Sequence, residues 1–404
     1  MSWRRRTIAV ALGLAAVLPC GTAWAQDTRV EAITDEQAEK SKETQPYKVG
    51  AWENIADAIE SGRWLNPAYT HGFFPTFETV YPGGGFNFGG GWRYFTGYDS
   101  YFDVRGVYSA KGYKLGEARV KFPNAFDGRL ATGIRAGWRD ATQVGFWGVG
   151  NETDVNDRAN FRVQETVVEA GFEFKPVRWM FFEGAGAYED FTEKPGLGKY
   201  DSIEERYDAT TAPNLGGDPA YTRVRGAAGF NWLTSPGYSR RGGLLRFAHD
   251  EFYPIADTEG GNFGLSRIEL VQHLPMFRET WVLSLRGRGE TVSSNLDDVP
   301  YFLLPWLGSG NTLRGYETAR FRDRSTMLYS AELRWIANRR LLDVAVFADA
   351  GNVARDVEHL RFQNMTTDYG IGVRFHTPGL TLLRVEYAQG SEGWRIVTST
   401  GAAF

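Results

Sequence analysis

The strongest constraint on the fold is an alternation of side chains along segments of about nine to twelve residues. Around Trp138, every second residue is apolar or small, and Arg135 and Arg139 fall between them. A strand sends successive side chains to opposite faces, so one face of such a segment suits lipid and the other suits water. The same split recurs at 224–232, 281–288 and 327–335.

Segment length distinguishes a membrane barrel from a soluble sandwich. Crossing a bilayer takes roughly 9 to 11 residues of tilted strand, whereas globular strands are mostly about five or six residues long. Beyond the first residues, no run approaches the roughly 18 to 20 apolar residues of a spanning helix. A mean hydropathy of -0.37, 15% aromatic residues and 48 glycines suit a barrel with aromatic girdles and glycine turns. We therefore predict an all-β, antiparallel transmembrane β-barrel.

The number of strands follows from the spacing of the turn residues. Eleven candidate strands precede a long connection at 292–323 and five follow it, which gives sixteen, an even number as in other single-chain bacterial barrels. Long connections at 143–160, 192–219 and 292–323 alternate with tight ones such as Arg339-Arg340. We expect the long loops outside, the short turns inside, and inward arginines and carboxylates that stay wet in a polar lumen.

The N-terminus has the features of a secretory signal peptide. Residues 1–25 hold a basic stretch (Arg4 to Arg6), an apolar stretch and the small-residue cleavage site Ala23-Trp24-Ala25. Lipidation at Cys20 is the alternative. Cleavage leaves 379 residues (404 minus 25) without cysteine and with a charge of -7, because three arginines are lost from the original -4. No disulfide is then available.

Residues 26–72 predict a short leader, and residues 73–404 the barrel. Trp52, Ile55 and Ile59 have helical spacing, which predicts one short amphipathic helix in the leader. The leader could plug the lumen, lie on the periplasmic membrane face or stay loose, and the sequence leaves these alternatives open.

One set of motifs lies in the last third of the chain. Leu313-Arg314-Gly315-Tyr316 is followed by Glu332 in one predicted strand and by Phe347, Asp349 and Gly351 in the next. This order resembles the BamA/TamA-type superfamily of outer-membrane assembly and secretion barrels. The resemblance implies that the long loop folds back into the barrel and that Arg314 docks against Glu332, Phe347 and Asp349. Residues 146–150 and 370–374 resemble the family more weakly.

The residues themselves agree with that assignment. Glu332 alternates with outward apolar residues, as do Phe347 and Asp349, so all three should face the lumen. An arginine between two carboxylates can use its planar fork bidentately. Gly315 would allow a sharp turn, and Tyr316 would supply a flat packing face. The alternative is that Arg314 caps a surface loop. In a wet lumen we expect only a modest effect of Arg314→Ala.

The C-terminus alternates through Trp394 and Ile396 to a terminal Phe404. This ending resembles the signal read by the outer-membrane assembly machinery, which we expect to be a partner during biogenesis. Gly393 and Gly401 predict a closing strand that pairs weakly.

The resemblance implies a role in inserting or translocating protein or lipid across the bacterial outer membrane. The family's inserting and secreting members carry POTRA modules, for which 47 leader residues leave no room, so we expect a member without them. The alternatives are a passive solute pore with an arginine-lined lumen, or a structural surface antigen. Expected partners are outer-membrane lipid, lipopolysaccharide and an unknown periplasmic partner or client protein.

Other chemistry finds little support in the sequence. The five histidines, His71, His249, His273, His359 and His376, lack metal-ligand spacing and a paired nucleophile motif. The glycine runs at 83–85 and 89–91 lack the lysine of a phosphate loop. Acidic residues at 154, 157, 297 and 298 could bind calcium but are more often solvated. No basic tract suggests nucleic acid. We expect no enzyme activity, no cofactor and no metal.

Overall fold

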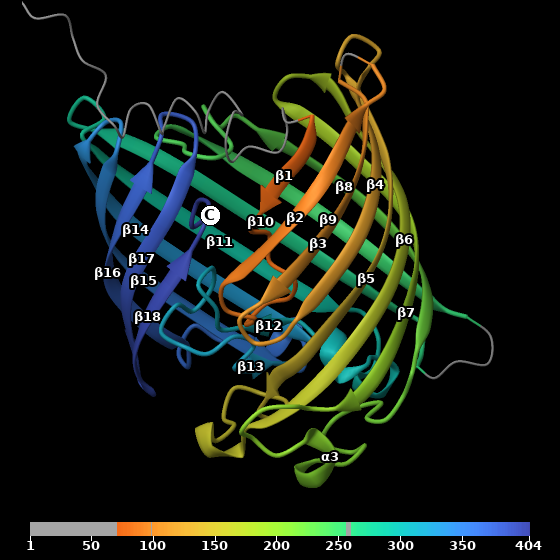
Figure 1. Ribbon diagram of the computed structural model, residues 1–404. Coiled ribbons are helices and arrows are strands. Elements are labelled where there is room, and N and C mark those ends of the chain that lie inside the picture. The colour runs from red at the N-terminus through yellow and green to blue at the C-terminus, as the bar shows by residue number, and fades with distance from the viewer. Residues whose placement is uncertain (1–70, 98, 256–259) are drawn as a thin grey trace, which may run out of the picture. The chain divides into compact units, whose positions relative to one another are not determined.

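Within the described residues, the main sheet is antiparallel and has sixteen strands, each paired with its neighbours among these strands in chain order (Figure 1). The computed structural model describes residues 71–97, 99–255 and 260–404, so the predicted signal peptide and helical leader lie outside the described residues. The predicted division into eleven strands before the long loop and five after it is confirmed. The strands are β1 (Gly72–Thr76), β2 (Asn87–Phe95), β3 (Tyr101–Ser109), β4 (Lys114–Ala125), β5 (Leu130–Phe146), β6 (Ala159–Val177), β7 (Met180–Pro195), β8 (Ala220–Asn231), β9 (Gly242–Pro254), β10 (Phe263–Met276), β11 (Trp281–Val292), β14 (Ser325–Asn338), β15 (Leu342–Ala354), β16 (Thr366–His376), β17 (Thr381–Gly390) and β18 (Gly393–Ser399).

The sheet curls round on itself, with β1 and β18 as its edges (Figure 1). Within the described residues no ladder joins these two strands, so the closed barrel that the sequence predicts is not observed. The cause lies in the edges themselves. β1 has five residues, and Pro75 among them has no amide hydrogen to donate. β18 has seven residues and stops at Ser399, shortly before Gly401 adopts a φ of 81°.

The predicted alternation places the apolar residues outside. Ile134, Trp138, Val224 and Trp335 are exposed on the outer face, whereas Arg334, next to Trp335, is buried on the inner face. The three longest connections, 147–158, 196–219 and 293–324, join strands at one end of the sheet. Most connections at the other end, such as 178–179 and 339–341, are short. Within the described residues, no helix has the length and apolarity that crossing a bilayer requires.

The interior is filled at the end with the long connections. An apolar cluster there combines wall residues such as Phe146, Phe161 and Phe252 with Tyr301 and Phe302 of the 293–324 connection. Tyr301 stacks edge-on against Phe146 at 5.1 Å and Phe161 at 4.9 Å between ring centroids. The connection is thus anchored inside the curl of the sheet by buried aromatic contacts.

Candidate functional site

The 293–324 connection, which we call the inserted loop, carries the candidate site. It joins β11 to β14 and contains the two-stranded sheet of β12 (Trp306–Leu307) and β13 (Phe321–Arg322), which Figure 1 shows inside the curl of the main sheet. Leu313 at its tip is fully buried and packs in a second apolar cluster with Leu307 and Leu328. These apolar contacts hold the tip against the inner wall of β14 and β15.

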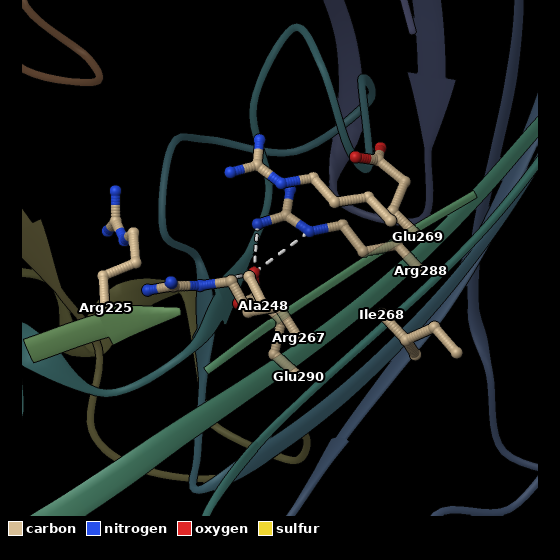
Figure 2. A pocket seen from close by; sticks show the side chains of 8 residues that line it. Arg225, Ala248, Arg267, Ile268, Glu269, Arg288 and Glu290 are labelled. Carbon is tan, nitrogen blue, oxygen red and sulfur yellow. Dashed lines mark hydrogen bonds and ion pairs between the residues drawn. The ribbon is translucent and has the colours of Figure 1, made fainter. Parts of the chain in front are cut away.

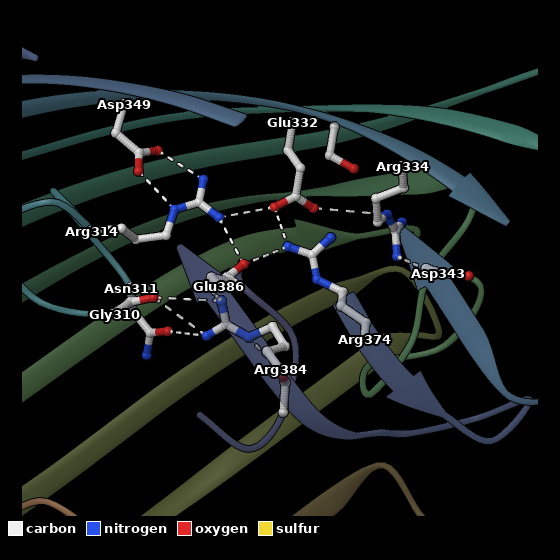
Figure 3. A network of polar contacts seen from close by, with 12 residues as sticks. Gly310, Asn311, Arg314, Glu332, Arg334, Asp343, Asp349, Arg374, Arg384 and Glu386 are labelled. Carbon is white, nitrogen blue, oxygen red and sulfur yellow. Dashed lines mark hydrogen bonds and ion pairs between the residues drawn. The ribbon is translucent and has the colours of Figure 1, made fainter. Parts of the chain in front are cut away.

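Arg314 lies among the residues that the sequence predicts as its receivers (Figure 3). Its Nε donates to Asp349 Oδ2 at 2.7 Å and its Nη2 to Asp349 Oδ1 at 3.1 Å, which makes the pair bidentate. Its Nη1 donates to Glu332 Oε2 at 3.0 Å and to Glu386 Oε1 at 3.1 Å. The guanidinium lies 3.4 Å from the ring centroid of Phe347. Glu386 is not among the receivers predicted from the sequence.

Three arginines and three carboxylates surround this contact, and ion pairs of Arg334 with Glu332 and Asp343, each at 3.9 Å, extend the network along the wall (Figure 3). Arg374 bonds to Glu332 and, at 2.9 Å, to Glu386, and Arg384 bonds to Glu386 at 2.9 Å. We call this cluster the loop lock; its members are Arg314, Glu332, Asp349, Arg374, Arg384 and Glu386. Their side chains are at most 3% exposed.

The prediction of wet inward charges is therefore wrong at the loop lock. The cluster is formally neutral, with three cations and three anions, and the inserted loop covers it. Asn311 Oδ1 accepts from Arg384 at 2.6 Å, so the loop also supplies polar contacts to the wall. Burial by itself lowers the pKa of Arg314. The negative charge of Asp349 and its hydrogen bonds to Arg314 outweigh this effect, and the charges of Glu332 and Glu386 add to them, so the pKa is raised above its ordinary value. Arg314 stays a cation.

Gly315 lies in a tight turn at the tip, in which Tyr316 N donates to Leu313 O at 3.2 Å. Its φ lies outside the left-handed region, so the turn itself does not require glycine, whereas close approach does. A Cβ at this position would lie 2.7 Å from Asp368 Cβ and 2.8 Å from the Gly390 backbone nitrogen. Gly351 is similar, because a Cβ there would lie 2.7 Å from Leu307 Cδ1. Both glycines let the loop backbone and side chains pack directly against the strands.

The tip also contacts the hairpin of β17 and β18, the last two strands. The Tyr316 hydroxyl donates to Thr367 O at 3.1 Å and accepts from the Ser391 backbone nitrogen at 3.1 Å. Arg320 bonds to Glu392 in the same hairpin turn at 2.7 Å. A Cβ on Gly310 would lie 2.8 Å from Val397 Cγ1 of β18. The inserted loop is thus attached to one of the two free edges of the sheet.

Comparisons with known proteins identify the family of this chain. A profile described as the Omp85 superfamily domain matches residues 97–393, well over half of the chain. The chain belongs to the Omp85 superfamily. It is an outer-membrane protein, and the resemblance to BamA/TamA-type barrels is confirmed. No curated protein sequence matches the chain.

Two solved structures share the fold of this Omp85 chain. BamA from Haemophilus ducreyi lacking POTRA domains 1-3 matches with a TM-score of 0.59 and 13% identity, over 81% of this chain and 68% of that one. CdiB from Escherichia coli matches with a TM-score of 0.51 and 13% identity, over 82% of this chain and 59% of that one. At such identities the likeness shows the fold alone.

Of the two weaker family motifs of this Omp85 chain, one contacts the inserted loop and the other contributes to the loop lock. In the 146–150 motif, Phe146 packs on Tyr301, and the Gly150 backbone nitrogen donates to Arg322 O at 2.8 Å. In the 370–374 motif, Arg374 is a member of the loop lock. The 146–150 motif therefore packs directly on the inserted loop, and the 370–374 motif supplies a wall residue to the lock.

The C-terminal residues behave differently from the prediction of one alternating strand. Trp394 and Ile396 lie on the outer face of β18 and are 63% and 65% exposed. Phe404 lies beyond the strand, because the positive φ of Gly401 turns the chain away. The ring of Phe404 instead stacks at 6.4 Å on His273 of β10, an inward residue.

A second contact across the interior, made by the connection 232–241, was not predicted from the sequence. The connection 232–241, between β8 and β9, reaches the turn between β16 and β17, where Thr381 N donates to Gly237 O at 2.9 Å. Its Tyr238 is buried, stacks on His376 at 4.0 Å and donates to Asp343 Oδ2 at 2.8 Å. The signal was weak, because a tyrosine in a short turn is ordinarily exposed.

The remaining candidates show local roles. Within the described residues, no three His, Cys, Asp or Glu side chains gather as a metal site. Asp154 accepts a hydrogen bond from Asn156 N at 2.8 Å, and that bond lowers the pKa of Asp154. Gly91 is packed against Phe74, where a Cβ would lie 2.4 Å from Cζ. His359 pairs with Asp356 at 2.5 Å.

Proposed function

We propose that this Omp85 chain assists the insertion or translocation of protein or lipid at the opening between β1 and β18. The observation that carries the proposal is that the two edge strands are short and unpaired with each other among the described residues. An unpaired edge offers backbone N–H and C=O groups to an incoming strand. Inside a membrane such groups need a partner, so an open edge favours a transient guest strand or local disturbance of the lipid.

The edge strands also carry exposed apolar side chains. Phe73 on β1 is 87% exposed, and Trp394 and Ile396 flank the other edge. Beside β1 lies a hollow of about 620 Å³ lined by Phe73, Phe74, Pro75 and neighbouring residues of β2 and β3. Aromatic groups at an open edge suit contact with acyl chains or with the apolar face of a client strand.

The loop lock supports the proposal because it rests against the same edge. Tyr316, Arg320 and Gly310 contact the β17–β18 hairpin, so the docked loop stiffens the β18 side of the opening. On the other side, β1 is held by its pairing with β2. The same packing weighs against the alternative of a wide passive pore, because the loop and its apolar cluster occupy the interior. No observation favours a purely structural surface antigen.

Reconstituted liposomes test the proposal. Purified protein should speed the folding of a urea-unfolded outer-membrane barrel, or move fluorescent lipid between leaflets, relative to liposomes that hold an inert closed barrel. Two readouts are needed: protease resistance of the client, and quenching of the labelled lipid from outside. If neither readout exceeds that of the inert barrel, the proposal is wrong.

A cross-link between β1 and β18 tests whether the activity takes place at the opening between them. Cysteines introduced on the outer faces of β1 and β18 and joined by a flexible bifunctional cross-linker should suppress either activity, and reduction of a cleavable linker should restore it. A matched pair of cysteines on β9 and β10, which are already paired along their length, should have no effect when cross-linked. Equal activity with both tethers would place the function away from the opening.

A further inference from the structure

A second cluster of inward arginines lies on the wall formed by β8 to β11. Arg225, Arg246, Arg267 and Arg288 come from four successive strands and line one hollow of about 280 Å³ together with Glu269 and Glu290 (Figure 2). We call these four residues the arginine face. They share the inner face of the sheet with buried Arg223, whereas Val224 and Phe247 are exposed on the outer face. Ile268, which also borders the hollow, points away from the guanidinium groups in Figure 2.

The cations of the arginine face are open and the anions beneath them are covered. The four arginine side chains are 30 to 36% exposed. Asp250, which pairs with Arg225 at 2.6 Å and also with Arg267, is fully buried, and Glu290 is 6% exposed. Glu269 is 27% exposed but pairs with Arg286 at 2.6 Å. The surface offered to the hollow is therefore mostly guanidinium.

The arginine face also keeps unused hydrogen-bond donors. Its hydrogen bonds to the described residues engage one nitrogen each of Arg225, Arg246 and Arg267, and two of Arg288. A guanidinium carries several N–H donors in a fixed fork, so each of these arginines keeps donors that have no hydrogen bond to a described residue. The residues that line the hollow, four arginines and two glutamates, have a formal charge of plus two. Asp250 and Glu183, which pair with Arg225, Arg267 and Arg246, lie outside the lining.

We propose that the arginine face binds a molecule carrying two or more phosphate groups. A phosphate offers several oxygens and a high charge to the planar forks of more than one arginine. Strands about 4.8 Å apart place β8 and β11 roughly 14 Å from each other, a span that one phosphate cannot bridge and two can. The ligand is either a lipid headgroup with two phosphates or a soluble oligophosphate. This inference does not depend on the proposed function.

Titration calorimetry on the full chain in detergent micelles tests the inference with two probes. Inorganic triphosphate represents the soluble source, and micelles doped with cardiolipin, which has a two-phosphate headgroup, represent the lipid source. We expect saturable binding of at least one probe, weakened as salt is raised because exposed charges are screened. Competition of triphosphate with bound cardiolipin would support one shared site, and absence of binding by both probes would overturn the inference.

The variant R225Q/R288Q links any binding to the arginine face. Asp250 keeps Arg223 and Arg267 as partners, and Glu290 keeps Arg267, so no buried carboxylate is left alone. We expect about tenfold weaker binding or more, as follows from losing charge-assisted hydrogen bonds. R225K/R288K keeps the positive charges but loses the planar fork of the guanidinium. Its affinity for the probes should lie between that of R225Q/R288Q and that of the parent protein.

R135Q is the matched control. Arg135 is 36% exposed and does not line the hollow. Its partners Glu169 and Glu117 keep other arginines, so again no carboxylate is left alone. Binding to R135Q should equal that of the parent protein, and heat-modifiability gels should show that all variants fold. Equal loss in R135Q and R225Q/R288Q would mean that the probes bind the overall charge of the lumen, and the inference would be wrong.

Discussion

The loop lock and the arginine face use the same residue types on the same inner surface, yet they differ in exposure. The lock arginines are at most 2% exposed, and those of the arginine face are 30 to 36% exposed. The difference comes from the inserted loop, which supplies Arg314 and Asn311 to the lock, whereas the hydrogen bonds of the arginine face all go to wall strands. Covered charges fix a loop, and uncovered charges can bind a ligand.

Removing Arg314 should give the largest effect on stability. Arg314→Ala leaves three buried carboxylates with two arginines in the lock, and breaking a buried ion pair costs about 3 to 5 kcal/mol of unfolding free energy. This exceeds the modest effect expected for a wet lumen. The temperature at which the folded band disappears in heat-modifiability gels should fall clearly.

Arg314→Lys should lose less, because the charge stays and only the bidentate geometry is lost. Arg241→Ala, on a side chain 63% exposed that pairs with Glu279, should change nothing measurable. A transition of Arg314→Ala that coincides with the parent transition would mean that the loop is not held by this contact.

Glu386→Gln should have the next largest effect. Glu386 accepts from Arg314, Arg374 and Arg384, and the change leaves three buried cations with two anions. Because the amide oxygen can still accept a hydrogen bond, we expect a loss of about 2 to 3 kcal/mol. Urea unfolding followed by tryptophan fluorescence measures it. Glu279→Gln, on an exposed turn, is the control, and equal losses in both variants would argue against a dry lock.

Gly315→Ala should act through steric contact alone. Its Cβ would meet Asp368 Cβ at 2.7 Å and the Gly390 nitrogen at 2.8 Å, so the tip must move away from the β17–β18 hairpin. Overpacking of this kind costs about 1 to 3 kcal/mol. Limited proteolysis of the loop should become faster. Gly216→Ala is the control, because a Cβ there meets no heavy atom within 4 Å although the φ is positive, so it adds backbone strain without steric contact. Identical rates of loop cleavage in both variants would contradict the predicted steric effect at Gly315.

Arg225→Gln should have the smallest effect on stability. Asp250 retains two other arginines, and a partly exposed ion pair contributes about 0 to 1 kcal/mol. Its urea midpoint should stay within error of the parent even though ligand binding falls. A large loss of stability would show that the arginine face is structural and not free for a ligand.

The sequence predicts the wall well, because alternation and turn spacing are local properties. The sixteen strands and the outward placement of Trp138 and Trp335 follow from that pattern. The tip motif and the order of Glu332 and Asp349 also predict which residues meet Arg314. These residues lie on neighbouring strands, so their register follows from pairing β14 with β15.

Three features could not be predicted from the pattern within single strands. They are the burial of the loop lock, the contact of Glu386 with Arg314, and the reach of Tyr238 across the interior to His376. Each depends on how far a loop reaches across the interior. The path of a loop is set by packing against residues distant in the sequence, and not by the alternation of side chains along a strand. Arg384 and Glu386 alternate with outward Leu383 and Tyr387, so the pattern puts both inside. It does not say that Arg314 also reaches Glu386. The open edge likewise depends on the relative lengths of β1 and β18.

Hydrogen–deuterium exchange of the inserted loop tests most directly whether buried charges hold it in the interior. In the parent protein in micelles, peptides covering 308–320 should exchange slowly, because amides such as Ala319 N and Tyr316 N are hydrogen-bonded within a buried tip. The same peptides should exchange rapidly in Arg314→Ala and stay protected in Arg225→Gln. Rapid exchange of these peptides already in the parent protein would contradict a docked loop.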